Sequence, residues 1–85
     1  MATTDVCISF NAKHDEAVNF TNASGEECQL KQVGTVWAFT DPPPFSVPVS
    51  GRQTKVKSKA DLGDGTFYYT PSCCTTLVQK SVTVP

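Results

Sequence analysis

The sequence lacks three features that would place it quickly in a functional class. It has no run of eighteen apolar residues, so no segment is expected to span a membrane. It has no excess of positive charge, because 7 Lys and Arg residues stand against 8 Asp and Glu residues for a net charge of −1. Nucleic-acid-binding domains are normally basic, so nucleic acid is not an expected partner. It also lacks internal repeats and any amphipathic pattern of helical length, which speaks against repeat arrays and helical bundles.

The first ten residues, MATTDVCISF, also lack the basic and apolar segments of a secretory signal. Two explanations fit this absence. Either the protein is cytoplasmic as written, or the chain is a mature domain excised from a longer precursor and given a new Met1. In the second case, bridged cysteines would indicate an extracytoplasmic location.

What is present indicates a small folded domain. The 85 residues, of mass 9.2 kDa, are enough for one domain over residues 1–85, and a chain of this length buries only about 60–65% of its unfolded surface. Hydrophobic residues make up 39% of the chain and charged residues 18%. This composition is too apolar for a disordered chain and has too few charges for a coiled coil.

Short alternating runs separated by turn residues predict an all-β chain of about seven strands. The runs cover residues 5–10, 17–22, a segment beginning at residue 28, and 35–39, 53–60, 66–70 and 78–84. No helical segment separates them, so a parallel sheet with helical crossovers is not expected. The sequence therefore predicts a single-domain antiparallel β-sandwich that behaves as a monomer.

Four prolines interrupt the segment TDPPPFSVPVSG at residues 40–51. Proline has no backbone N–H to donate to a sheet, so this segment is expected to be an extended loop or an edge strand. Phe45, Val47 and Val49 still alternate within it, and we expect their side chains to pack beneath the loop.

The C-terminal third combines a glycine turn, an aromatic strand and a cysteine-bearing loop in DGTFYYTPSCC with a valine-rich strand in TTLVQKSVTVP. This order resembles the end of a cupredoxin-like β-sandwich, the fold of the small blue copper proteins. The resemblance implies a Greek-key sandwich over the whole chain and is most specific over residues 61–85. An immunoglobulin-like sandwich, with Trp37 buried against a cysteine bridge, is the alternative.

The resemblance does not extend to the copper ligands. A blue copper site uses two histidines, a cysteine thiolate and usually an axial methionine. This chain has a single histidine, His14, and its only methionine is Met1, while Cys73 and Cys74 occupy the loop that would hold the metal. No cofactor is therefore expected.

The four cysteines, Cys7, Cys28, Cys73 and Cys74, permit three pairings into two disulfides. We favour a bridge from Cys28 to Cys73 or Cys74, which would contribute about 4 kcal/mol on chain-entropy grounds. A bridge between the adjacent Cys73 and Cys74 would be strained and easily reduced. The alternative is a zinc or copper site formed by Cys28, Cys73 and Cys74 with His14, but the spacing matches no common zinc pattern.

Four basic residues, Arg52, Lys55, Lys57 and Lys59, form a strip. It could bind anions, but we favour the interpretation that lysines protect an edge strand from pairing with other sheets. Most aromatic residues are expected in the core, and Tyr68 faces opposite to Phe67 and Tyr69. With the strip, a candidate binding surface comprises Trp37, Phe45, Tyr68, Arg52, Lys55, Lys57 and Lys59.

No nucleophile and base are paired in the sequence, so an enzyme is not expected. We predict a non-enzymatic structural or binding module that contacts another protein through loop 40–48 and the C-terminal cysteine loop. The alternative is a small metal-binding or redox-sensitive protein that uses its cysteines.

Overall fold

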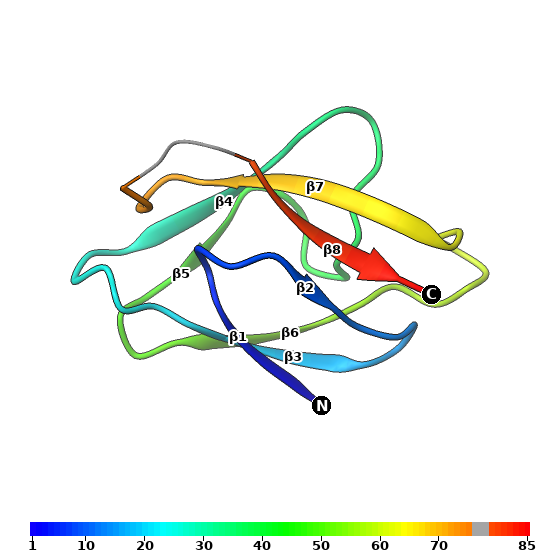
Figure 1. Cartoon of the computed structure of the whole chain (residues 1–85), viewed down its shortest axis with the longest axis horizontal. Coiled ribbons are helices and arrows are strands. Elements are labelled where there is room, and N and C mark those ends of the chain that lie inside the picture. Colours follow the sequence, from blue (N-terminus) through cyan, green and yellow to red (C-terminus); the bar gives the residue numbers. More distant parts are fainter. Residues whose placement is uncertain (76–78) are drawn as a thin grey trace.

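The computed structural model describes residues 1–75 and 79–85, and these residues form two packed β-sheets (Figure 1). One sheet has the order β1-β3-β6 and the other has the order β2-β8-β7-β4-β5. The eight strands are β1 (Ala2–Asp5), β2 (Phe10–Asn11), β3 (Ala17–Thr21), β4 (Cys28–Gln32), β5 (Phe45–Val47), β6 (Arg52–Lys55), β7 (Gly65–Pro71) and β8 (Lys80–Val84). The described part of the chain contains no helix, and hence no helix that could cross a membrane. The all-β prediction is therefore confirmed, with eight short strands instead of about seven.

Alternating side chains from both sheets fill the space between them. Val18 and Phe20 point inward from β3, and Val82 and Val84 point inward from β8. The ring of Phe20 lies at the centre, with ring centroids 5.5–6.2 Å from those of its aromatic neighbours Phe10, Phe39, Phe45 and Tyr69. Such edge-to-face contacts stabilise a core beyond the area that they bury.

The prediction of a wholly antiparallel sandwich is wrong, because β1 pairs with β3 and β2 pairs with β8 in parallel. The cause lies in residues 5–10, which were expected to form one strand. The chain turns after Asp5, whose Oδ1 accepts a hydrogen bond from the Cys7 backbone N–H at 3.0 Å and whose carbonyl accepts one from Ile8 at 3.1 Å. This turn moves the chain from the three-stranded sheet to the five-stranded sheet (Figure 1).

The expected strand at residues 35–39 is also absent, apart from one bridge between Phe39 and Val56. Trp37, Ala38 and Phe39 are all buried, so the segment does not alternate between core and solvent as a surface strand does. Its tryptophan and phenylalanine pack inside the sandwich without joining either sheet as a strand.

The proline-rich segment does contain an edge strand, as expected. β5 pairs only with β4, and it buries Phe45 and Val47. Val49 is 54% exposed, however, so its expected burial is wrong. The reason is a turn closed by the hydrogen bond from the Gly51 N–H to the Pro48 carbonyl at 2.8 Å, which lifts Val49 away from the core. In the predicted strand at residues 78–84, the first residue lies outside the described part of the chain.

Candidate functional site

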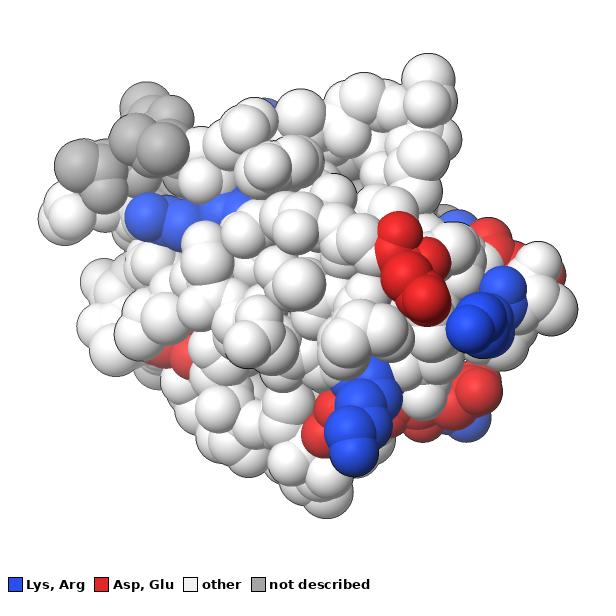
Figure 2. Space-filling view, turned by 45° about the vertical axis from the view of Figure 1, so that its right-hand side comes forward, with Lys and Arg blue, Asp and Glu red and all other residues white. Residues whose placement is uncertain are grey.

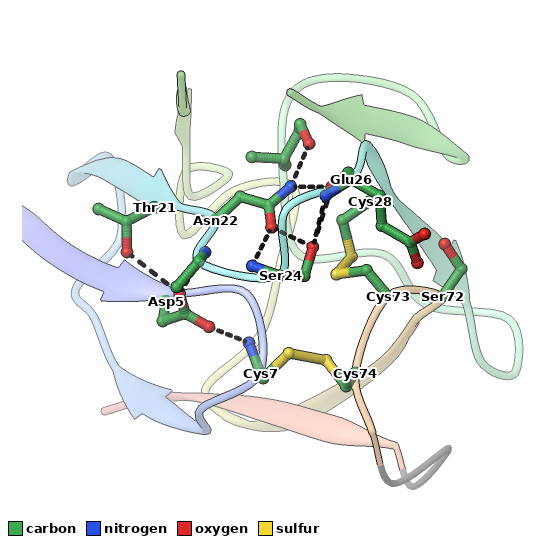
Figure 3. Close-up of a disulfide and its surroundings, with 12 residues drawn as sticks. Asp5, Cys7, Thr21, Asn22, Ser24, Glu26, Cys28, Ser72, Cys73 and Cys74 are labelled. Carbon is green, nitrogen blue, oxygen red and sulfur yellow. Dashed lines mark hydrogen bonds between the residues drawn. A yellow bond between two sulfur atoms is a disulfide. The ribbon is translucent and has the colours of Figure 1, made fainter. Parts of the chain in front are cut away.

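All four cysteines form disulfides, Cys7 with Cys74 and Cys28 with Cys73 (Figure 3). The expected bridge from Cys28 is present, and no bridge joins the two adjacent cysteines. Cys73 and Cys74 lie in the turn that follows β7, so neighbouring residues are tied to two different parts of the chain. Cys28 is the first residue of β4, and Cys7 lies in the turn between β1 and β2. Together the bridges connect this turn to both sheets.

The Asp5 carboxylate connects the turn after β1 to the loop between β3 and β4 by hydrogen bonds that do not depend on the disulfides. Asp5 accepts hydrogen bonds at Oδ2 from the Ala23 backbone N–H at 3.2 Å and from the Thr21 hydroxyl at 3.4 Å. Its other oxygen accepts the Cys7 N–H. The turn after β1 is therefore attached to the loop between β3 and β4 (Figure 3).

The buried amide of Asn22 fixes the β3–β4 loop itself. Its Nδ2 donates to the carbonyls of Glu26 at 2.7 Å and Val47 at 2.9 Å, and its Oδ1 accepts from the Ser24 hydroxyl at 2.6 Å. These contacts satisfy the amide and connect the loop to the end of β5. A buried polar group with all its partners contributes rigidity, because losing one would leave an unpaired group in the core.

We call the region formed by residues 5–9, 22–28 and 72–75 the disulfide end. Its ranges contain the acidic residues Asp5, Glu26 and Glu27 but no lysine or arginine. Ile8 is 58% exposed within it. The disulfide end thus combines a braced backbone, an exposed aliphatic side chain and carboxylates without a neighbouring basic residue in these segments.

A hollow of about 540 Å³ extends from the disulfide end over the outer side of the three-stranded sheet. Asn22 and Ala23 line it from the disulfide end, and Val49 and Ser50 line it from the β5–β6 turn. The strand residues that line it are the uncharged polar residues Thr3, Asn19, Thr21 and Gln53, together with Phe20 and the charged Arg52. The turn that follows loop 40–48 therefore borders a concave surface next to the disulfide end.

The ligand set considered for zinc or copper is not brought together. His14 lies in the β2–β3 connection, which Figure 1 shows at the opposite end of the molecule from the turn at residues 72–75. Its Nε2 is 2.8 Å from Asp64 Oδ1, and its Nδ1 is 3.2 Å from the Lys57 carbonyl. The sulfurs that cluster are instead those of Cys7, Cys73 and Cys74, all within 4.8 Å of one another. The hydrophobic pattern does not indicate that Cys7 lies beside Cys73 and Cys74, because its position depends on the turn after β1.

The contact between His14 and Asp64 alters the acidity of the carboxyl group. The hydrogen bond from His14, followed by the charge of Lys59, whose Nζ is 3.8 Å from Asp64 Oδ2, holds the pKa of Asp64 below its usual value. Asp64 lies at the surface, and its contact with His14 joins the β2–β3 loop to the β6–β7 loop. Among residues 1–75 and 79–85, the hydrogen-bond partners of His14 are a carboxylate and a backbone carbonyl.

Of the three aromatic residues in the candidate binding surface, two lie in the core and one is exposed. Trp37 and Phe45 are each only 5% exposed and belong to the core, so they cannot form a contact surface. The indole Nε1 donates to the Asp41 carbonyl at 2.6 Å, which anchors the proline-rich loop. Tyr68 is 44% exposed on the outer side of β7, opposite to the buried Tyr69, as expected.

The four residues of the basic strip also lie in different surroundings and do not form one continuous surface. Arg52 lies over the Phe45 ring at 4.8 Å from its centroid, donates to the Ser46 carbonyl at 3.1 Å and pairs with Asp41 at 3.5 Å. It therefore covers the β5 edge and is not free to bind an anion. Lys55 is exposed on β6, Lys57 is half-buried after that strand, and Lys59 lies beside Asp64.

β6 is the outer strand of its sheet. At Lys55, however, its edge is already paired, because the Thr40 N–H donates to the Lys55 carbonyl at 2.9 Å, so the lysine does not guard an open edge at this point. On the face drawn in Figure 2, side chains of both signs lie next to one another at the right-hand end, beside a broad uncharged area. Charges that alternate in this way create no single-sign field of the kind that attracts polyanions.

These observations define the class of protein as an all-β sandwich with one end braced by two disulfides. No protein-family model, no curated protein and no solved structure matches the chain.

Proposed function

We propose that the protein is a non-enzymatic, extracytoplasmic binding module that contacts another protein through its disulfide end and the adjoining hollow. The observation that carries this proposal is the placement of two exposed aliphatic side chains, Ile8 and Val49, on loops held by disulfides and hydrogen bonds. Side chains that are fixed before binding lose little entropy when a partner docks. The bridges fit an oxidising compartment, where such bonds persist.

The proposed partner presents an apolar surface with basic residues at its border. The disulfide end contributes three acidic residues and no basic residue, so a basic border would be complementary in charge. The hollow beside it is large enough to receive a protruding segment of the partner.

We also propose that the topology is cupredoxin-like, with the cysteine turn at the position of the copper-ligand loop. Three features support this: Gly65 opens β7 with φ 146°, aromatic residues follow it, and β8 pairs antiparallel with β7. An immunoglobulin-like topology fits less well, because its sheets are antiparallel, whereas two strand pairs here are parallel. Trp37 packs on the rings of Phe39 and Phe45.

A binding experiment with matched variants tests the proposed function. The oxidised protein is immobilised and exposed to the secreted proteins of its own source, in parallel with Ile8→Ser/Val49→Ser and with Val36→Ser as control. Val36 is also exposed, at 45%, but follows the end of β4 that is remote from Cys28. We expect a partner that the wild type and the control retain at low salt, that the double variant loses, and that salt weakens. Retention that is equal for all three proteins, or absent for the wild type, would overturn the proposal.

A further inference from the structure

We propose that Asn19 is a site of N-linked glycosylation and that Asn22, in a second motif next to it, is not. The acceptor motif is an asparagine, then any residue except proline, then serine or threonine. Residues 19–24 read NFTNAS and contain this motif twice. The proposal goes beyond the proposed function and rests on its extracytoplasmic setting, because the sugar is transferred in the oxidising lumen of a eukaryotic secretory pathway.

The transfer replaces one of the two hydrogens of the asparagine amide. Nδ2 attacks the first sugar carbon of a lipid-linked oligosaccharide, the bond from that carbon to the lipid diphosphate breaks, and the diphosphate leaves while the amide loses one proton. No group is oxidised or reduced in this step. A glycosylated asparagine therefore keeps a single N–H on Nδ2. In the folded protein it can serve one acceptor, and its sugar needs an open path to solvent.

The amide of Asn19 meets both conditions. Asn19 is half-buried on the outer side of β3, because its side chain points away from the core that buries Val18 and Phe20. Among residues 1–75 and 79–85, the one acceptor of its Nδ2 is the sulfur of Met1 at 2.8 Å, and Met1 is 74% exposed. The second hydrogen of the amide is thus spare. Because Asn19 also lines the hollow over the outer side of the sheet, a sugar attached to it reaches solvent.

The strands beside Asn19 offer a sugar polar and uncharged neighbours. Its partners in the strand register are Thr3 on β1 and Gln53 on β6, and both are exposed. Hydroxyl and amide groups donate and accept hydrogen bonds, as sugar hydroxyls do, so a glycan can lie on this face without covering a charge. The sugar then forms one border of the hollow, while Ile8 lies beyond the end of β3, in the disulfide end.

The amide of Asn22 meets neither condition. The residue is 5% exposed, and its Nδ2 uses both hydrogens, for the carbonyls of Glu26 at 2.7 Å and Val47 at 2.9 Å (Figure 3). A sugar in place of one hydrogen would leave one of these carbonyls unpaired, which is costly where the group is buried. The sugar is transferred before the chain folds, so both motifs are open to modification, but a chain modified at Asn22 cannot form the β3–β4 loop. The folded protein therefore carries its sugar on Asn19 alone.

The test begins with the protein purified from its own source. Peptide-N-glycosidase in heavy-oxygen water removes the sugar and leaves a labelled carboxyl group on the residue that carried it, which peptide mass spectrometry locates. We expect the label at Asn19 and none at Asn22. An unlabelled Asn19, or a label at Asn22, would overturn the proposal. Disulfide mapping of the same sample separates this outcome from the proposed function: bridged cysteines without a sugar leave the extracytoplasmic setting standing, whereas free thiols argue against both.

Matched variants secreted from eukaryotic cells identify the acceptor independently. Asn19→Gln removes the first acceptor and keeps a polar amide, while Ser24→Ala closes the second motif and keeps the Asn22 amide, at the loss of one hydrogen bond to its Oδ1. We expect the glycosidase-sensitive shift in mass to disappear in Asn19→Gln and to stay as in the wild type in Ser24→Ala. The reverse pattern, or a wild type without the shift, would contradict the assignment.

Discussion

Tyr69 illustrates how much a single residue in a thin core matters. Its side chain is 1% exposed, and its hydroxyl has no hydrogen-bond partner among the described residues. Burial raises the pKa of this phenol well above its usual value, because the ionised form would lose its hydration. The unpaired buried hydroxyl costs free energy, whereas the aromatic ring that carries it stabilises the core.

We predict that Tyr69→Phe leaves the protein at least as stable as the wild type. The variant keeps the ring contacts with Phe20 and Phe39 and removes only the unpaired hydroxyl, whose burial costs about 1–3 kcal/mol. Urea unfolding of both proteins measures the difference. A loss of more than about 1 kcal/mol would show that the hydroxyl has a partner.

Asp64 is predicted to make stability depend on pH in the acidic range. Its pKa is lowered in the folded protein, so its ionised form stabilises the fold above the pKa of the unfolded chain. That contribution is lost as the pH falls through the lower pKa of the folded state. We expect Asp64→Asn to be less stable than the wild type at pH 7 and to approach it below about pH 4. Thermal unfolding over pH 2–7 tests this, and a difference that persists unchanged in acid would refute the assignment.

At the scale of elements, strict alternation predicted the strands that have one face in the core. β3 and β7 lie within one residue of their expected ranges, and β5 is the edge strand expected from its prolines. Residues 5–10 alternate equally well, yet they form a turn. There the Asp5 side chain bonds to the Cys7 N–H and offers the backbone an alternative to strand pairing. This competition is not visible in a hydrophobic pattern.

Glycine substitutions are predicted to separate backbone strain from steric clash. Gly51 has φ +90°, and a Cβ built on it would lie 2.9 Å from the Phe20 carbonyl oxygen of β3. Gly25 has a similar φ of +85° but no atom within 4 Å of such a Cβ. Gly25→Ala should therefore cost about 1–2 kcal/mol, the strain of a left-handed conformation, and Gly51→Ala should cost clearly more. Equal losses in chemical denaturation would mean that the β5–β6 turn does not approach β3 closely.

At the scale of the whole molecule, stability depends on the disulfides because the chain is short. The bridges span 67 and 45 residues, and each is worth about 4 kcal/mol on chain-entropy grounds. Small domains have a total stability of about 5–15 kcal/mol, so one bridge is a large share of it.

The candidate site could be predicted from the sequence only in part. The sequence predicts a bridge from Cys28 to the cysteine loop at residues 73–74, and the structure contains it. The bridge from Cys7 to Cys74 could not be predicted, because it depends on the turn after Asp5 that leads the chain from one sheet to the other. The exposed surface was predicted less well. Trp37 and Phe45 were assigned to it because a sequence does not show which aromatic side chains a proline-rich loop encloses, and the structure places both in the core.

Removing one bridge is predicted to destabilise the protein without changing its fold. Cys28→Ser/Cys73→Ser should lower the free energy of unfolding by about 2–5 kcal/mol while the circular dichroism spectrum stays that of an all-β protein. Unfolding in urea measures the loss. A double variant as stable as the wild type would show that this bridge does not limit the unfolded chain.

The most direct test of the central claim is disulfide mapping of the non-reduced protein by mass spectrometry, with alkylation of any free thiol and fragmentation between Cys73 and Cys74. The disulfide end requires that Cys7 be linked to Cys74, that Cys28 be linked to Cys73 and that no thiol be alkylated before reduction. A bridge between Cys73 and Cys74, or alkylated cysteines in the native protein, would contradict it.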